Sequence, residues 1–224
     1  MFNVIIPARA GSKRLPGKNM MELCGNPLIY YTIMAAKEAK YVDEILVSTD
    51  DPRVINFAEE MGDVKLFSRG VKAGGDKATS FDVISECANV FPKSSKIIYL
   101  QPTSPLRTSE DINNACEMAV SGNPVVSVTE QEHPSAWIFS DDVKLSDCTI
   151  ERITTKRSQD HNKEFRLNGA IYIASLEDFT KYKSHLIPEA LLYHMPRIRS
   201  IDIDTFEDFR YAEFILKEQL NDYS

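Results

Sequence analysis

The sequence predicts an α/β fold with a mostly parallel sheet, in three layers. Short apolar runs rich in β-branched residues, such as 2–7 and 44–49, are each followed by a segment with the periodicity of an amphipathic helix. Strands that alternate with helices form parallel sheets with right-handed crossovers. With 43% hydrophobic residues, the 224-residue chain can build one full core, so we expect a single domain over 1–224.

Residues 1–62 contain two predicted strands and two predicted helices. Phe2 to Pro7 has the continuous apolar pattern of a strand buried on both faces. A turn ending at Pro27 precedes a helical stripe that runs to about Ala39. A second strand covers Glu44 to Thr49, and Asp51-Pro52 begins a helix that ends at Gly62.

The middle of the chain repeats this alternation. We expect short strands at 64–67, 96–100 and 125–128, of which 96–100 is central. Thr79 to Asp82 and Thr108 to Asp111 have capping-box spacing, so each begins a helix, the first of which runs to about Phe91.

The last part predicts a strand over 165–174, a short helix over 176–182 and an edge strand over 193–198. Thr205 to Asp208 caps a final helix. The core stripe of this helix is predicted to contain Phe206, Phe209, Ala212, Leu216 and Leu220.

A cationic, glycine-containing loop follows the first strand. Arg9, Lys13, Arg14 and Lys18 occur there with Gly11 and Gly17, and no acid appears before Glu22. Loops at the carboxyl end of a parallel sheet hold phosphates in α/β folds, because glycines let backbone N–H groups approach an anion. The loop differs from a P-loop, since five residues separate its glycines and Asn19 follows Lys18. A solvated basic loop is the alternative.

Two aspartates near the C-terminus form a second candidate site. In the stretch from Ser200 to Thr205, strand alternation puts Asp202 and Asp204 on one face, with Ile201 and Ile203 on the other. Two carboxylates on one face repel each other unless a cation lies between them, and Mg²⁺ prefers such ligands. The alternative is a pair of solvated helix-capping acids.

Composition excludes several classes of partner. The net charge of −7 argues against nucleic acid or an anionic membrane, and no apolar stretch is long enough to span a bilayer. Pro7 and Arg9 interrupt the first apolar run too early for a signal peptide. The four cysteines are scattered without a CxxC pair, so we expect reduced thiols in a soluble, cytoplasmic protein.

Taken together, these motifs resemble the acylneuraminate cytidylyltransferase (CMP-sialic acid synthetase) family. The resemblance rests on IPAR, a Gly-Ser-Lys turn and PGKN in the first loop, then LQPTSPLR at 100–107, NGAIY at 168–172 and IDIDT at 201–205. CMP-Kdo synthetases carry a GDEP-type turn in place of LQPTSPLR. The resemblance covers essentially the whole chain and implies a Rossmann-like, nucleotide-diphospho-sugar transferase fold.

The resemblance implies transfer of CMP from CTP to a nine-carbon acidic sugar, with release of pyrophosphate. It implies that Arg9, Lys18, Asp202 and Asp204 are catalytic and that the two aspartates hold Mg²⁺. The residues that it implies for the nucleotide and its phosphates are Ala8, Arg9, Gly11, Ser12, Lys13, Lys18, Asn19, Arg69 and Ser80. Those that it implies for the sugar are Gln101, Arg166 and Asn168.

Two segments leave alternatives open. Many family members have RRQD where residues 157–160 read RSQD, and this difference leaves the choice of acidic sugar open. We expect a sialic acid or a related nonulosonate such as legionaminate. The alternatives are a cytidylyltransferase for pseudaminate or Kdo, or a non-catalytic nucleotide-binding domain. Residues 130–164 lack a helix period and read as a β-rich excursion. The resemblance implies that this excursion is the arm of a homodimer; a long surface insertion is the alternative.

Overall fold

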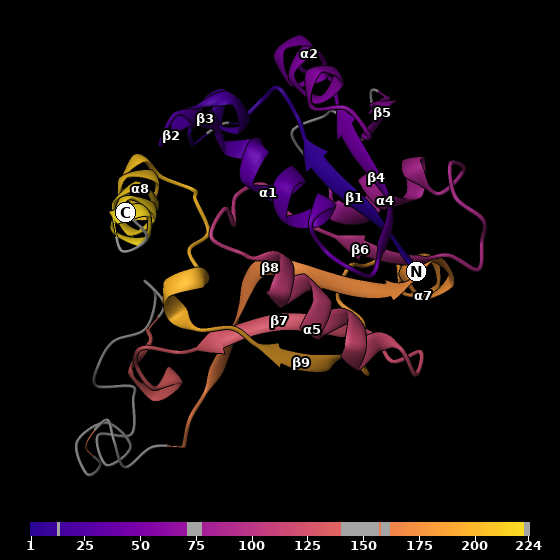
Figure 1. The fold of residues 1–224 in the computed structure, drawn as a ribbon. Helices are drawn as coiled ribbons and strands as arrows, with labels where there is room; N and C mark the ends of the chain where they lie inside the picture. The colour runs from indigo at the N-terminus through magenta and orange to yellow at the C-terminus, as the bar shows by residue number, and fades with distance from the viewer. Residues whose placement is uncertain (13, 71–77, 140–156, 158–161, 222–224) are drawn as a thin grey trace.

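A seven-stranded sheet with helices against both faces forms the centre of the molecule (Figure 1). The structure is a computed structural model, and it describes residues 1–12, 14–70, 78–139, 157 and 162–221. The three-layer α/β architecture predicted from the alternation of elements is confirmed. No helix in the described ranges is long and apolar enough to cross a membrane.

The strand order across the sheet is β5-β4-β1-β6-β8-β7-β9. Only β8 runs antiparallel to its neighbours β6 and β7, so the carboxyl ends of the other strands meet at one edge. The bounds are β1 (Phe2–Ala8), β4 (Val42–Thr49), β5 (Lys65–Ser68), β6 (Lys96–Tyr99), β7 (Val125–Glu130), β8 (Phe165–Ser175) and β9 (Leu191–His194), with a small hairpin of β2 (Glu22–Leu23) and β3 (Asn26–Pro27).

Helices cover both faces of the sheet. One face carries α1 (Leu28–Lys37), α2 (Pro52–Met61) and α5 (Ser109–Ala119), and the other carries α4 (Ser80–Cys87) and α7 (Leu176–Tyr182). Figure 1 shows α8 (Phe206–Asn221) beside the edge where β1 ends, on the side opposite the N-terminus. Short 3₁₀ helices are η1 (Lys18–Met20), η2 (Ser135–Trp137) and η5 (Arg197–Arg199).

Strand β1 is buried on both faces, as its apolar run predicts. Val4 and Ile6 pack into the cluster under α1 and α5, whereas Ile5 packs into the cluster under α4, and all three are fully buried. A third cluster joins Leu23 and Ile203 to the buried face of α8. This third cluster fixes the segment that precedes α8 against the carboxyl edge of the sheet.

Several boundaries and one strand differ from the sequence prediction. Helix α4 ends at Cys87, short of Phe91. The edge strand is Leu191–His194, because Pro196 begins a 3₁₀ turn. Segment 200–205 has no sheet partner and is not a strand; the backbone N–H of Ile203 bonds to the carbonyl of Thr103 instead.

The predicted core stripe of α8 is partly wrong. Phe209 and Ala212 are buried, but Phe206 is 52% exposed because it lies in the first turn of the helix, stacked on Phe209 beyond the cluster. The side chain of Leu220 and most of the predicted excursion (140–156 and 158–161) lie outside the described residues. The described part of that segment contains η2.

Candidate functional site

A cavity of about 460 Å³ opens at the carboxyl edge of the sheet, between the loop after β1, the turn after β6, the start of α4 and the segment before α8. Its size is within the range of small-molecule sites. Its lining residues are Pro7, Arg9, Ser12, Arg14, Lys18, Asn19, Arg69, Ala78, Thr79, Ser80, Val83, Tyr99, Gln101, Pro102, Thr103 and Asp204. Four of these carry positive charge and one carries negative charge, although the whole chain is acidic.

Two hydrogen bonds fix the ends of the loop between β1 and η1, one within the loop and one to Asp50. Asn19 Nδ2 donates to the carbonyl of Arg9 at 3.1 Å, which joins the two ends of the loop. The backbone N–H of Ala10 donates to Asp50 Oδ1 at 2.7 Å. Gly17 has φ +68°, and a Cβ there would lie 3.3 Å from Arg53 Nη2, so this position favours glycine. These contacts hold the described residues at the two ends of the loop in place.

Two cations of this loop pair with Asp204. Lys18 Nζ donates to the carbonyl of Ile203 at 2.7 Å and to Asp204 Oδ1 at 3.2 Å. Arg14 Nη1 lies 3.0 Å from Asp204 Oδ2, and its side chain is 71% exposed. The cationic loop after β1 and the segment with the two aspartates thus meet in one site, although Lys18 and Ile203 are 185 residues apart in the sequence.

Arg69 supplies positive charge from the other wall. Its Nε donates to the carbonyl of Ser48 at 3.0 Å, at the end of β4. Burial lowers the pKa of Arg69 from its usual value. A buried guanidinium beside an open cavity is suited to an anionic ligand, because the ligand replaces the solvation that burial removed.

Asp202 and Asp204 are both partly buried. Burial raises the pKa of Asp202, a hydrogen bond from Thr103 lowers it, and the nearby charge of Asp204 raises it again; the result is a raised pKa. A divalent cation near both carboxylates would favour their ionised forms, and so it would offset the desolvation of Asp202 and the repulsion between the two charges. The described residues contain no cluster of three or more metal-ligating side chains, and Mg²⁺ fits a pair because it needs only one or two carboxylates besides water and substrate phosphates.

The turn after β6 and the strand β8 approach Asp202 closely. Gly169 in β8 has φ +77°, and a Cβ added there would lie 2.9 Å from Gln101 Oε1 and 3.3 Å from Asp202 Oδ2. The buried Arg107 donates from Nη1 to the carbonyls of Gln101 and Ala170, at 3.3 Å and 2.9 Å. Arg107 therefore ties the turn to β8.

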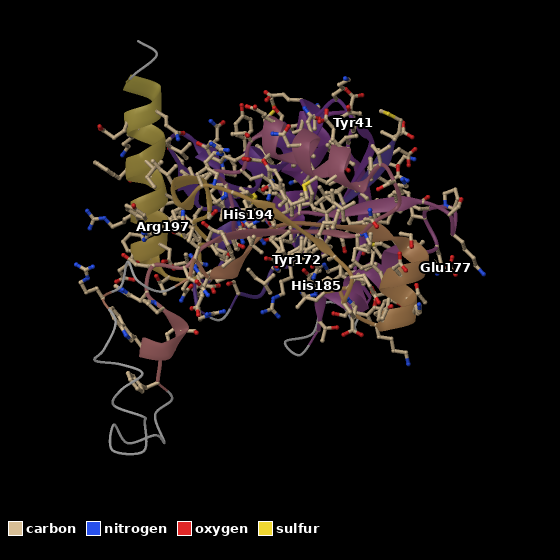
Figure 2. The ribbon with its side chains drawn as sticks, turned by 90° about the horizontal axis from the view of Figure 1, so that it is seen from below. Tyr41, Tyr172, Glu177, His185, His194 and Arg197 are labelled. Atoms are coloured by element: carbon tan, nitrogen blue, oxygen red, sulfur yellow. The ribbon has the colours of Figure 1, made fainter. Side chains whose placement is uncertain are left out.

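Aromatic side chains lie beneath the Gln101 end of the cavity. Figure 2 labels Tyr172 and His185, whose ring centroids are 4.6 Å apart. Tyr99 lines the cavity and packs on both rings. Burial raises the pKa of Tyr99 to about 12 and also raises that of Tyr172. Both phenols are therefore neutral near pH 7 and serve as packing surface rather than as bases.

The structure brings most of the predicted site residues together. Those that line the cavity are Arg9, Ser12, Lys18, Asn19, Arg69, Ser80, Gln101 and Asp204. Ala8 is buried at the end of β1, Gly11 is exposed on the loop, and Asp202 lies beside Gln101. Lys13 lies outside the described residues.

Two predicted sugar-binding residues are not among the lining residues. Arg166 is exposed on β8 and donates from Nη1 to the carbonyl of Leu167 at 3.3 Å. Asn168 is 1% exposed, and its amide bonds to Ser127 and Ser200. A direct sugar contact by either residue stays a prediction.

Three residues that line the cavity were not among the site residues predicted from the sequence: Arg14, Tyr99 and Thr103. Arg14 was recognisable as one of the four cations of the loop, but nothing in its spacing distinguishes a partner of Asp204 from a solvated arginine. Tyr99 ends the central strand β6, and Thr103 occupies the LQPTSPLR turn, so their positions were predictable. Whether the side chains of Tyr99 and Thr103 face the cavity depends on the tertiary fold, which a local sequence pattern does not contain.

Comparison with known sequences identifies relatives of this chain. Residues 3–215 match the family described as Cytidylyltransferase. An N-acylneuraminate cytidylyltransferase of Streptococcus agalactiae is 36% identical over 92% of this chain, which spans about half (51%) of that protein's length. A CMP-N,N'-diacetyllegionaminic acid synthase of Legionella pneumophila is 34% identical over 95% of both chains, and a pseudaminic acid cytidylyltransferase of Campylobacter jejuni is 30% identical over 95% of both.

Solved structures agree on the fold. A CMP-2-keto-3-deoxy-manno-octonic acid synthetase complexed with CTP has a TM-score of 0.72 at 17% identity, covering 98% of this chain and 100% of that one. A 4-diphosphocytidyl-2C-methyl-D-erythritol synthase has a TM-score of 0.67 at 11% identity, covering 96% and 98%. From its sequence match and its fold together, this chain belongs to the acylneuraminate cytidylyltransferase family of cytidylyltransferases.

Proposed function

We propose that the protein transfers CMP from CTP to a nine-carbon acidic sugar, a sialic acid or a related nonulosonate such as legionaminate, and releases pyrophosphate. The observation that carries this proposal is the cavity in which a cationic loop faces the carboxylate of Asp204, with Asp202 beside Gln101 at one end. Such a site suits in-line displacement at phosphorus, which depends on positioning and charge neutralisation. The named activities of the relatives support the same reaction.

The triphosphate would lie along the loop after β1. Arg9, Lys18 and Arg14 would neutralise its oxygens, and Arg69 would do so from the opposite wall. Backbone N–H groups near Gly11 and Ser12 would donate to the same oxygens, with Lys13, Ala8 and Asn19 part of the cradle. Ser80, at the start of α4, would contact the nucleotide, where a helix N-terminus favours an anion.

The chemical step is one displacement. The anomeric hydroxyl oxygen of the sugar forms a bond to the α-phosphorus, the bond from that phosphorus to the bridging oxygen of the β-phosphate breaks, and pyrophosphate leaves with the electron pair. The hydroxyl proton passes to solvent or to a carboxylate of the site. Asp202 and Asp204 would hold Mg²⁺, which neutralises charge on the phosphates when it is bound.

The sugar would bind at the Gln101 end of the cavity. Gln101 lines the cavity and lies next to Asp202, so its amide can orient a hydroxyl close to the reacting phosphorus. Arg166, from the exposed start of β8, would pair with the carboxylate of the acidic sugar. Sialic, legionaminic and pseudaminic acids differ in substituents, and such pocket contacts are worth about 1–3 kcal/mol each.

Two finer proposals concern the setting of the enzyme. We propose a homodimer in which residues 130–164 contact the second subunit, on the family resemblance alone. We also propose a cytoplasmic location, because the CTP substrate is an intracellular metabolite and the composition resembles that of a reduced, soluble protein.

The test is pyrophosphate release from CTP and Mg²⁺ with a panel of N-acetylneuraminate, legionaminate, pseudaminate and Kdo. We expect release with a nonulosonate and none after EDTA is added. Release with Kdo alone would show that the acceptor is the eight-carbon sugar Kdo and not a nonulosonate. If CTP binds but no sugar causes release, the protein is a non-catalytic nucleotide-binding domain.

A further inference from the structure

Strand β8 is irregular where it passes the candidate site. Val126 pairs with Tyr172 and Val128 pairs with Leu167, so the single residue Ser127 of β7 faces four residues of β8, 168–171. Such bulges redirect backbone and side chains near functional sites. Here the bulge carries Gly169 toward Gln101 and Asp202.

The amide of Asn168 is fully engaged inside the protein. Its Oδ1 accepts from Ser127 Oγ at 2.6 Å and from the backbone N–H of Ala170 at 3.2 Å. Its Nδ2 donates to Ser200 Oγ at 2.9 Å and toward Met195 Sδ at 3.3 Å. An asparagine side chain offers two donor hydrogens and two acceptor lone pairs, so its capacity is used completely. None is left for a ligand.

The two serines bonded to Asn168 are themselves satisfied. Ser127 Oγ accepts from the backbone N–H of Ile171 at 2.7 Å, which closes the bulge from the β7 side. Ser200 Oγ donates to the carbonyl of Pro196 at 2.9 Å, so it meets Asn168 as an acceptor. The chain Ser127–Asn168–Ser200 is fully buried and joins β7, β8 and the connection between β9 and α8.

Ser200 is two residues before Asp202 in a segment without sheet pairing. Other contacts also hold this segment. They include the backbone bond from Ile203 to Thr103, the burial of Ile203 against α8, the pairing of Asp204 with Lys18 and Arg14, and the bond from the backbone N–H of Asp204 to Asp208. The carboxylate positions therefore depend on side-chain bonds rather than on a strand ladder. Residues that orient metal ligands from behind control metal affinity.

We propose that Asn168 is a positioning residue: through Ser200 it holds the segment that carries Asp202 and Asp204, and through Ser127 it sets the bulge that places Gly169 beside them. It does this in place of the direct sugar contact that the family resemblance implies. This inference rests on the proposed function: its kinetic consequences need the proposed reaction, and its effect on metal binding needs the proposed metal site at Asp202 and Asp204 but no turnover.

The test compares Asn168→Asp, Ser200→Ala and the double variant with the matched control Asn123→Asp. Asn123 is an exposed asparagine that also donates to a serine, Ser121, so this control makes the same chemical change away from the site. In Asn168→Asp, an oxygen replaces the donor that faces Ser200 Oγ, whose single hydrogen already serves Pro196. Ser200→Ala removes the acceptor without burying a charge, and it remains informative if Asn168→Asp does not fold.

The readouts are the Kd of Mn²⁺ with CTP, measured by electron paramagnetic resonance, and the KM of the sugar. We expect Asn168→Asp and Ser200→Ala each to weaken Mn²⁺ binding about tenfold, in the range seen when outer-shell partners of metal ligands are lost. The sugar KM should stay within about twofold. The double variant should be no worse than the poorer single variant, because both break one connection.

Other outcomes overturn the inference. A raised sugar KM in Asn168→Asp, with unchanged Mn²⁺ binding and a normal Ser200→Ala, would mean that Asn168 touches the sugar. Unchanged Mn²⁺ binding and unchanged kinetics in both single variants would show that Asn168 does not position the aspartates. If the wild-type protein binds Mn²⁺ and CTP but turns over no sugar, the proposed function fails, whereas the binding measurements still decide the role of Asn168.

Discussion

At the scale of single residues, charge placement gives the site its character. Four cations line a cavity in a chain of net charge −7, and two of them, Arg14 and Lys18, contact Asp204 directly. Without a ligand, these pairs neutralise the aspartate. If a triphosphate with Mg²⁺ bound there, these side chains would exchange partners: the cations would bind phosphate oxygens, and the carboxylates would bind the metal.

Lys18→Met tests the central cation. It removes the charge and the bonds to Ile203 and Asp204 while it retains most of the side-chain bulk. Loss of one donor to developing charge lowers kcat by about 10²–10³-fold, and we expect that loss in pyrophosphate release. Lys65→Met, at an exposed lysine paired with Glu44, is the control and should have wild-type activity. A Lys18→Met enzyme as active as the control would remove Lys18 from the catalytic set.

Gly169→Ala tests the close approach of β8 to the site. A Cβ at this position meets Gln101 and Asp202, whereas Gly122, which also has a positive φ, has open space around it. Both Gly→Ala changes should destabilise folding by about 1–2 kcal/mol, because L-residues pay that to adopt the left-handed region. Only Gly169→Ala should also lower kcat/KM, by about 10²-fold, since displacement of catalytic groups by an ångström has that effect. Equal activity of the two variants would show that the approach has no catalytic role.

The sequence predicts which residues belong to the site where the chemistry is local, but it does not predict what each of them contacts. The cations after β1 and the two aspartates were found from charge and spacing alone. Asn168 was identified through NGAIY, but three of the four partners of its amide, Ser127, Met195 and Ser200, are far away in the sequence. No local pattern contains that information.

At the scale of elements, helix starts were the most predictable feature. The capping boxes at Thr79 and Thr108 form as their spacing predicts, because a threonine and an aspartate three residues later satisfy each other's backbone groups. Segment 200–205 shows the opposite case. Its alternation suggested a strand, but Ile203 is buried against α8 and the chain finds no neighbouring strand to pair with.

The two capping boxes allow a matched test of stability. Asp82 caps α4 from a half-buried position. Asp111 caps α5 while fully buried, and it accepts from Arg199 at 2.8 Å and 2.9 Å and from Tyr193 at 2.9 Å. We expect Asp82→Asn to cost about 1 kcal/mol, the value of a cap, and Asp111→Asn about 3 kcal/mol, because it leaves Arg199 without its buried carboxylate. Urea unfolding at pH 7 measures both. Similar costs would mean that the Asp111–Arg199 pair adds nothing beyond the cap.

Asp111 also predicts a pH dependence. Burial alone would raise the pKa of Asp111, but the bonds from Arg199, Thr108 and Tyr193 outweigh it and lower the pKa. The stability that this carboxylate contributes is therefore complete above the unfolded pKa of about 3.9 and is lost as the pH falls through the lower folded value. Unfolding free energies below pH 4 should fall less steeply in Asp111→Asn than in the wild type. An identical slope would contradict this assignment.

At the scale of the whole molecule, the sheet positions the site. The alternation of strands and helices predicted the parallel half of the sheet, and the loop after β1 lies at its carboxyl edge, as expected. The reversal of β8 and its bulge against β7 were not predictable, because both arise from pairings between strands far apart in the sequence. Gly169 lies in that bulge, where it approaches Gln101 and Asp202.

The central claim is that this one cavity joins the α-phosphorus of CTP to a sugar hydroxyl with the help of Asp202 and Asp204. The most direct measurement uses CTP labelled at the α- or the γ-phosphorus, Mg²⁺, and the panel of acidic sugars, for the wild type and for Asp202→Ala/Asp204→Ala. We expect the α-label in a CMP-sugar and the γ-label in pyrophosphate, with transfer nearly abolished in a folded double variant. If the α-label stays in CTP, appears as free CMP with every sugar, or moves equally well in the double variant, the account is contradicted.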